Sequence, residues 1–288
     1  MFAFDMLSDF HVEFNSNWEI NIEYDELGKY YPWHLDKKSD VLVINGDCSN
    51  HPNVTVRIIK EAALQYDQVM FTDGNHEHYI GYTQTKHTVD VNNQLFEDLS
   101  AEVDNITYLN GTNSVMVDDT MFIGVNGWYD FTANHFMSRE QQHDAWRIYS
   151  NDSKCIRFDK GGYPDKLAWA QAESLRHLVE GVQDDPQVKH IVVATHTIPH
   201  RRGMVSDTHQ WGHLNGAYMN TLMQQVWIAD EANKIKVWCY GHTHNRDDFD
   251  AEGIRFVNNA RGYSMERKQE QFEGVVKLEV GPPVDPLS

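Results

Sequence analysis

Short apolar runs recur along the chain and end abruptly in polar or glycine-rich turns. Six of them have the length and the Val, Ile, Phe and Trp content of β-strands, and they cover 2–7, 41–44, 68–71, 120–125, 190–194 and 235–240. Several are continuously apolar, which is typical of strands covered on both faces. Weaker strand patterns cover 106–109, 113–117, 254–257 and 274–280.

Helical patterns lie between these runs, at 54–66, 83–102, 138–149, 163–180 and 217–232. The fourth has Pro164 in its first turn and Gly181 after its last residue, the usual placement of these two residues at helix ends. Strands and helices alternate first and strand pairs follow, which indicates a layered α/β protein. We expect one domain over 1–281 and a proline-rich tail over 282–288.

Two long segments, 126–162 and 197–216, show little periodicity apart from the helix at 138–149. Connections this long in a compact domain are usually functional or disordered. The second contains His200, Arg201 and Arg202, which we expect to contact substrate.

Composition limits the class of partner. The chain has 288 residues, of which 41% are hydrophobic, and this is enough for a large core. Its formal net charge of −19 repels phosphate backbones, so long nucleic acid is disfavoured. A bound metal cluster reverses the field locally, and a small phosphorylated substrate therefore remains compatible with the acidic chain.

Cellular location is indicated by the cysteines and by the apolar stretches. The three cysteines form no CxxC pair, and the N-terminus has no basic region before its short apolar run. No apolar stretch approaches the roughly 18 residues of a membrane span. We therefore expect a cytoplasmic, soluble protein with no membrane partner.

Polar groups that bind metals follow five of the predicted strands. They are Asp9 and His11, then Asp47, then Asn75 and His76, then His196, and finally His242 and His244. Ligands gather beyond the carboxyl ends of strands in such sheets. Carboxylates, imidazoles and one amide without sulfur suit Mn²⁺, Fe or Zn²⁺. Without His76 these are seven groups, too many for one ion, and if Asp47 bridges, each of two ions receives four.

The order of these motifs resembles that of the calcineurin-like metallophosphoesterase superfamily, which reads DxH, GD, GNH[DE], H and GHxH. The resemblance spans 8–244 and implies a four-layer αββα sandwich of two mixed β-sheets flanked by helices. It implies one metal held by Asp9, His11, Asp47 and His244, and a second held by Asp47, Asn75, His196 and His242. His76 matches the catalytic histidine of the superfamily, and Asp73 is a candidate to orient a neighbouring imidazole.

The chain departs from the protein phosphatase branch of that superfamily. That branch reads GDxVDRG, whereas this chain reads Gly46-Asp47-Cys48-Ser49-Asn50, without the Asp-Arg pair that positions the catalytic histidine. The segments 8–14, 74–79 and 259–263 look instead like a branch of small bacterial and phage phosphoesterases.

The resemblance implies hydrolysis of a phosphate ester by in-line attack of a hydroxide that bridges two divalent ions, Mn²⁺ first among them, with His76 as general acid. We expect the substrate to be a phosphomonoester or phosphodiester of a small molecule or nucleotide. Two alternatives are a non-catalytic scaffold of the same fold and a nuclease. The complete set of ligands disfavours the scaffold, and the absence of a visible appended DNA-binding domain disfavours the nuclease.

Overall fold

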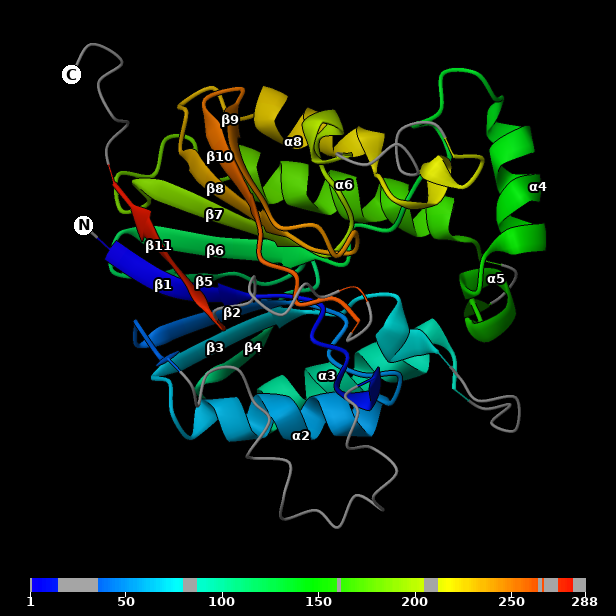
Figure 1. The fold of residues 1–288 in the computed structure, drawn as a ribbon. Helices are drawn as coiled ribbons and strands as arrows, with labels where there is room; N and C mark the ends of the chain where they lie inside the picture. Colours follow the sequence, from blue (N-terminus) through cyan, green and yellow to red (C-terminus); the bar gives the residue numbers. More distant parts are fainter. Residues whose placement is uncertain are drawn as a thin grey trace.

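The computed structural model describes residues 2–14, 36–79, 87–159, 162–204, 212–263, 266 and 274–281. Its strands form two sheets (Figure 1). The first has the order β11-β1-β2-β3-β4 and consists of β1 (Phe2–Leu7), β2 (Val41–Asn45), β3 (Gln68–Thr72), β4 (Ile106–Tyr108) and β11 (Val276–Val280). The second has the order β5-β6-β7-β8-β10-β9 and consists of β5 (Val115–Val117), β6 (Thr120–Val125), β7 (His190–Thr195), β8 (Ile235–Tyr240), β9 (Asp247–Ala251) and β10 (Ile254–Asn258). Both sheets mix parallel and antiparallel neighbours.

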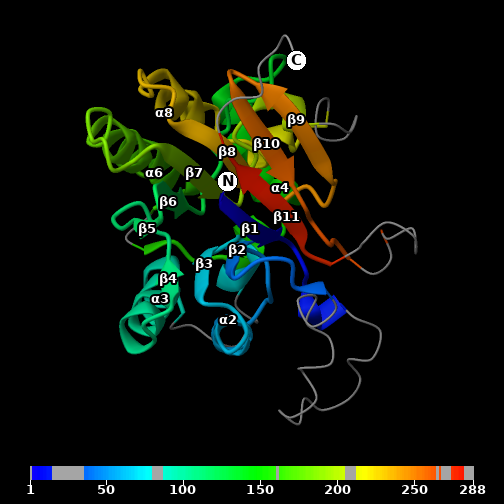
Figure 2. The same ribbon diagram turned by 90° about the vertical axis from the view of Figure 1, so that its left-hand side faces the viewer.

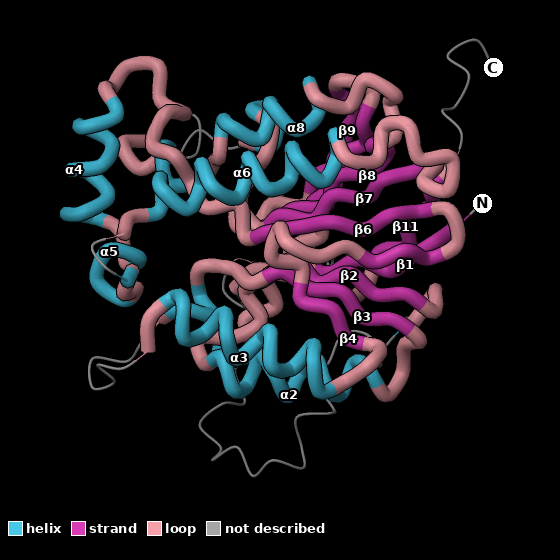
Figure 3. The backbone as a smooth tube through the Cα atoms, turned by 180° about the vertical axis from the view of Figure 1, so that it is seen from behind, coloured by secondary structure: helices cyan, strands magenta, loops and turns pink. Residues whose placement is uncertain are grey.

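Helices cover the outer face of each sheet. The first sheet carries α2 (Pro52–Ala63) and α3 (Val89–Glu102), and the second carries α6 (Pro164–Glu180) and α8 (Gln224–Ile228). Figure 2 shows these two pairs on opposite sides of the paired sheets, and Figure 3 shows the same layers from behind. The chain is therefore a four-layer αββα sandwich of two mixed sheets, which confirms the expected fold.

The alternation of side chains along β2 shows why its sequence is apolar at every position. Val41 and Val43 pack in the core between the two sheets, whereas Leu42 and Ile44 pack in the cluster that includes Ile58 of α2. Successive side chains of a strand point to opposite faces, so a strand with a sheet on one side and a helix on the other needs an unbroken apolar run.

Two parts of the fold differ from the sequence-based expectation. Residues 217–232 do not form one helix: the short 3₁₀ helices η6 (Asn215–Ala217) and η7 (Thr221–Met223) precede the five-residue α8. Asn220 interrupts the pattern because its side chain accepts a hydrogen bond from the Leu222 N–H and donates one to the Ala168 carbonyl. Strand β9 was not expected, because its acidic sequence lacks an apolar pattern. It lies at the edge of its sheet, where it pairs only with β10.

The helices expected at 54–66, 138–149 and 163–180 are present, and their ends differ from the expected ones by at most three residues, whereas the short helix Asp152–Cys155 was not predicted. The helix expected at 83–102 begins at Val89, after Thr88, whose side chain accepts a hydrogen bond from the Val91 N–H. The part of that prediction over 83–86 and the tail at 282–288 lie outside the described residues. The single domain over 1–281 stays a prediction. Among the described residues, no helix is both long and apolar enough to span a membrane.

Residues 126–159, the described part of the first long segment, lie at the end of the sandwich toward which β1 runs (Figure 1). They form α4 (Arg139–Tyr149), close to the expected 138–149, and the short α5 (Asp152–Cys155). Ser138 caps α4 through a reciprocal pair of hydrogen bonds with Gln141. Buried aromatic side chains, among them Trp128, Tyr129 and Trp146, form the core of this segment.

Candidate metal centre

The backbone at the candidate ligands has an uncommon conformation. Asp9, His11, Asp47, His242 and His244 have φ between 35° and 72°, and they are five of the nine described non-glycine residues with positive φ. This left-handed region costs a residue with a side chain about 1–2 kcal/mol. Hydrogen bonds between the strand ends hold it in place: the Asp9 N–H donates to the Gly46 carbonyl and the His11 N–H to the Asp47 carbonyl, both at 3.1 Å. Strained backbone of this kind concentrates at functional sites.

Two motif glycines allow groups to approach closely. A Cβ on Gly74 would overlap the Asp47 carboxylate and lie 2.6 Å from the Asp47 backbone nitrogen. A Cβ on Gly241 would overlap the Ser8 hydroxyl and the Asp9 carboxylate. Neither glycine has a positive φ, so glycine is required at these positions because it has no side chain and not because of its conformational freedom.

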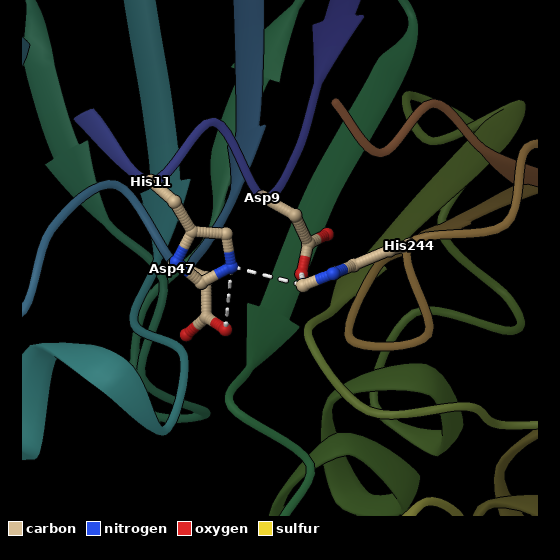
Figure 4. A group of neighbouring side chains, drawn as sticks. All are labelled: Asp9, His11, Asp47 and His244. Carbon is tan, nitrogen blue, oxygen red and sulfur yellow. Dashed lines mark hydrogen bonds and ion pairs between the residues drawn. The ribbon is translucent and has the colours of Figure 1, made fainter. Parts of the chain in front are cut away.

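The first group of donors consists of Asp9, His11, Asp47 and His244, which converge from three strand ends (Figure 4). The Nε2 atoms of His11 and His244 are 2.9 Å apart. His11 Nε2 lies 3.6 Å from Asp47 Oδ2, and His244 Nε2 lies 3.6 Å from Asp9 Oδ1. One possible ligand atom from each residue lies within 4.8 Å of the others, so the four side chains form a cluster that fits a metal ion.

The second group shares Asp47 with the first. Asp47 Oδ2 lies 3.3 Å from His196 Nε2. The amide oxygen of Asn75 lies 3.0 Å from that nitrogen and 3.1 Å from His242 Nδ1. The structure thus brings together all seven residues that the sequence singled out, in two groups that meet at Asp47. Their roles as ligands stay predictions.

Three of the four imidazoles are held by a hydrogen bond from the nitrogen that faces away from the cluster. His196 Nδ1 pairs with the Asn45 carbonyl at 2.8 Å, and His242 Nε2 with the Ala217 carbonyl at 3.0 Å. His244 Nδ1 pairs with Glu266 at 2.7 Å. Such bonds place a proton on the outer nitrogen, so the inner one is an electron-pair donor whenever the imidazole is neutral. Asp73 does not do this for a candidate ligand, since its imidazole partner is His78, at 2.7 Å.

Electrostatics in the cluster favour a cation. Burial, followed by the neighbouring His196, lowers the pKa of His242 to about 4. Burial also opposes the charging of His196, but the Asp47 carboxylate outweighs it and raises the pKa of His196 to about 10. Buried carboxylates attract positive charge strongly in a low dielectric, and together with the inward-facing nitrogens they form a donor set that suits a divalent ion.

His76 is the first residue of η3 (His76–His78), which follows β3. Asn75 already has helical backbone angles, so the two neighbouring side chains diverge by about 120° about a helix axis and both reach the site. His76 Nδ1 pairs with Asn50 Oδ1 at 2.6 Å, and its Nε2 lies 3.1 Å from the Tyr263 hydroxyl and 4.0 Å from Asp47 Oδ2. Tyr79 stacks on the ring at 4.1 Å.

A third set of possible donors includes His76, and it offers this residue a role as a metal ligand besides that of general acid. His76, His11 and Glu13 each have a possible ligand atom within 4.8 Å of the others. Burial raises the pKa of Glu13 to about 8. Geometry alone therefore leaves His76 with two roles, acid or ligand, which kinetics can separate.

Glu77 occupies the last position of the GNH[DE] pattern, for which the sequence predicted no role. It is fully buried, and its carboxylate accepts backbone hydrogen bonds from Asp47 at 2.9 Å, Cys48 at 2.6 Å and Gly74 at 2.7 Å. It thereby joins the turns after β2 and β3, which carry Asp47 and Asn75. Its position three residues after Gly74 was the feature of the sequence that could have identified it. The N–H groups of Asp47 and Cys48, which donate to it, come close only in the folded chain.

The cluster opens into a cavity of about 280 Å³. Asp47, Asn75, His76, His242 and His244 line it, and the tyrosines at 79, 149, 218 and 263 contribute to its walls. None of the described residues that line it is a lysine or an arginine. Asp152 and Glu266, which also line it, add negative charge.

The structure does not bring His200, Arg201 and Arg202 into this cavity. His200 and Arg201 line a separate cavity of about 500 Å³. Arg201 donates to the Ala133 carbonyl at 3.1 Å, and Arg202 donates to the Asp250 carbonyl at 2.7 Å. None of the three is among the described residues that line the cavity at the cluster, and their contact with substrate stays a prediction.

Known proteins resemble the chain in sequence and in fold. The family model described as calcineurin-like phosphoesterase matches residues 2–246, which include every motif of the site. An uncharacterized protein of Acanthamoeba polyphaga mimivirus is 26% identical over 282 residues, which are 91% of this chain and 91% of that protein. The crystal structure of the phosphopantetheinyl hydrolase of Mycobacterium tuberculosis has a TM-score of 0.76 at 14% identity, covering 99% of this chain and 98% of that one. At this identity the structural likeness supports the fold alone.

Proposed function

The chain belongs to the calcineurin-like phosphoesterase family of metal-dependent hydrolases, and we propose that it hydrolyses an ester of a small phosphorylated molecule at a centre of two divalent metal ions. The observation that carries this proposal is the division of seven donors, the Asn75 amide oxygen among them, into two groups that share Asp47. Seven donors exceed what one such ion usually coordinates, whereas two ions with one bridging carboxylate coordinate all seven.

In this proposal Asp9, His11, Asp47 and His244 hold one ion, and Asp47, Asn75, His196 and His242 hold the other. Oxygen and imidazole donors without sulfur favour Mn²⁺, with Fe and Zn²⁺ compatible. When bound, such ions supply Lewis acidity and lower the pKa of water toward neutrality. The protein contributes orientation, through the outer hydrogen bonds of His196, His242 and His244.

His76 is the residue we propose to handle the proton. Its Nε2 faces the cavity, 4.0 Å from Asp47 Oδ2, and Asn50 holds its Nδ1. In that position the imidazolium form, which carries a proton on each nitrogen, can give its Nε2 proton to the departing oxygen of the ester and become the neutral imidazole. The Tyr263 hydroxyl, 3.1 Å from Nε2, can pass a proton to or from the same atom.

The charge of the cavity favours a phosphodiester as the substrate. A phosphomonoester brings about two negative charges at neutral pH and a diester brings one. The described lining supplies no lysine or arginine and adds Asp152 and Glu266, so the second charge would be opposed. The tyrosine walls suit a planar or apolar substituent on the ester, such as the base of a nucleotide.

The test is metal content and hydrolysis, measured on the same preparation. Elemental analysis after loading with Mn²⁺ should give two ions per chain for the native protein and for Asp98→Asn, a control on an exposed position of α3. Asp47→Asn should reduce both ions. Hydrolysis of bis-p-nitrophenyl phosphate should exceed that of p-nitrophenyl phosphate, stop on chelation and return with Mn²⁺.

Each part of the proposal has its own contrary result. One ion or none per chain contradicts the dinuclear centre. Hydrolysis that persists after complete chelation contradicts metal dependence. Faster hydrolysis of the monoester contradicts the choice of a diester, and uptake of two ions without hydrolysis of either ester points to a scaffold.

A further inference from the structure

The amide of Asn75 has two ends of nearly equal shape and opposite chemistry. Its oxygen can donate an electron pair to a cation, whereas its NH₂ group cannot. In the structure Oδ1 lies 3.0 Å from His196 Nε2 and 3.1 Å from His242 Nδ1, which places the oxygen in the second donor group. Rotation of the amide by 180° would turn the NH₂ group toward that group instead. Something must therefore hold the amide in one orientation.

Asp152 is in contact with the other end of the amide. Asn75 Nδ2 donates to Asp152 Oδ1 at 2.9 Å, and the Asp152 side chain is buried, with 5% of the residue exposed. An ionised carboxylate only accepts hydrogen bonds. The reversed amide would place its oxygen against a carboxylate oxygen, with no proton between them, so the contact selects the orientation that points Oδ1 at the cluster.

Two tyrosines fix the carboxylate itself. The Tyr79 hydroxyl donates to Asp152 Oδ1 at 2.6 Å, and the Tyr129 hydroxyl donates to Oδ2 at 2.7 Å. Burial, reinforced by the nearby Asp152, raises the pKa of both tyrosines, so both hydroxyls keep their protons. Trp146 Nε1 donates to the Tyr129 oxygen at 2.7 Å and anchors this tyrosine to α4. The carboxylate thus accepts hydrogen bonds from two parts of the chain, the segment after β3 and the segment after β6.

The same contact reaches His76. Tyr79 stacks on the His76 ring with a centroid distance of 4.1 Å and an angle of 20° between the planes. A single carboxylate therefore restrains both Asn75 and the tyrosine that packs on the candidate acid. This gives a physical reason for the long segment 126–162, which carries Asp152 to the end of β3.

From these contacts we propose that Asp152 is a positioning residue that fixes the Asn75 amide with its oxygen toward the second metal ion. The inference rests on the proposed dinuclear function. It concerns affinity for one of the two ions, since the first donor group contains neither Asn75 nor a contact of Asp152. Partners of this kind typically change metal affinity by about 10- to 100-fold.

The experiment measures Mn²⁺ affinity by titration in native protein, Asp152→Ala, Asn75→Ala and the double variant. Asp152→Ala should weaken one binding event by about 10- to 100-fold and leave the other nearly unchanged. In the Asn75→Ala background, Asp152→Ala should have little further effect on that event, because the amide it orients is absent. Additive losses in the double variant, or equal weakening of both events, would overturn the proposal.

Two controls separate positioning from general damage. Tyr129→Phe removes one donor to the same carboxylate but keeps the bond from Asn75, so it should reduce the affinity for the second ion much less than Asp152→Ala does. Asp144→Asn, an exposed carboxylate on α4, should change the affinity for neither ion. If Tyr129→Phe reduced the affinity for one ion as much as Asp152→Ala does, the effect would be due to packing, which would contradict the proposal.

A metal-independent measurement distinguishes this inference from the proposed function. In NMR spectra the side-chain NH₂ of Asn75 should exchange slowly with water in the native protein, and this protection should be lost in Asp152→Ala. Uptake of fewer than two ions by the native protein would refute the dinuclear function, while the protected amide would still support the contact. An unprotected amide in the native protein would overturn the positioning role whatever the ion count.

Discussion

The Nδ1 atom of His76 donates a hydrogen bond to the amide oxygen of Asn50, at a nitrogen–oxygen distance of 2.6 Å. The bond sets the tautomer, because it keeps the proton on Nδ1 and turns Nε2 toward Tyr263 and Asp47. The protein phosphatase pattern supplies an aspartate and an arginine for this purpose, and the sequence lacks both. Asn50 provides the orienting contact without adding a negative charge beside the imidazole.

Asn50→Ala should therefore reduce turnover and spare the metals. Loss of the acceptor for the buried His76 Nδ1 proton costs about 1–3 kcal/mol, which corresponds to about a 5- to 150-fold fall in kcat if the orientation of His76 matters in the transition state. Metal content should stay at the native level. His51→Ala is the control, since His51 is the exposed next residue and its side chain makes no capping bond to α2. Unchanged kcat in Asn50→Ala would show that the contact is dispensable.

Gly241→Ala should expel metal through a steric effect. Its Cβ would collide with the Ser8 hydroxyl and the Asp9 carboxylate, so the variant should lose about 1–3 kcal/mol of stability and bind fewer ions. Gly253→Ala is a matched control: its φ of +76° costs about 1–2 kcal/mol, but nothing lies within 4 Å of the new methyl group. Elemental analysis and thermal unfolding should give similar stability for the two variants and a metal loss only in the first. Equal metal content would contradict the steric argument.

The site was predictable where its chemistry is local in sequence. Each candidate ligand follows an apolar run directly, and parallel strands bring such positions to one edge, so Asp9, Asp47 and Asn75 could be placed together before any fold was known. The apolar runs themselves identified the central strands, since burial on both faces leaves an unbroken pattern.

The residues that orient the ligands could not be predicted, because their partners are far away in sequence. Asp152 lies 77 positions from Asn75, and Glu266 lies 22 positions from His244. Neither position has a pattern that marks it. Proximity in sequence is a weaker guide for Arg201, which was predicted to contact substrate because it follows His196: in the structure its guanidinium donates to the Ala133 carbonyl, and it is not among the described residues that line the cavity at the cluster.

Asp5 should make stability depend on pH. It is fully buried in β1, and burial raises its pKa above the ordinary value of 3.8, although Lys38, Tyr66 and Ser39 donate hydrogen bonds to it. The folded chain therefore holds this proton more tightly than the unfolded chain. The contribution to stability is fully present below about pH 3.8 and is lost as the pH rises through the folded pKa.

Urea unfolding of the native protein and of Asp5→Asn at a series of pH values would test this. As the pH rises above 3.8, the unfolding free energy of the native protein should fall relative to that of Asp5→Asn, and the difference should then become constant. Tyr66→Phe removes a donor to the Asp5 carboxylate at 3.0 Å, so it should shift this change to higher pH. A difference that is constant over the whole range would contradict a raised pKa.

His76→Ala should separate the two roles that geometry allows for this residue. If His76 protonates the departing oxygen, metal content should be nearly native, and kcat for an ester with a poor leaving group, such as an alkyl phosphate ester, should fall by about 10²- to 10⁴-fold. For a p-nitrophenyl ester the fall should be much smaller, because p-nitrophenolate leaves without a proton.

The two esters distinguish the roles because loss of a metal ligand should slow the hydrolysis of both esters equally. Native protein and Asn50→Ala, assayed on the same two esters, supply the comparison: Asn50→Ala should show the same preference for the good leaving group in weaker form, since it only misplaces the imidazole. Equal losses on both esters, accompanied by loss of an ion from His76→Ala, would instead assign His76 to the donor group that it forms with His11 and Glu13.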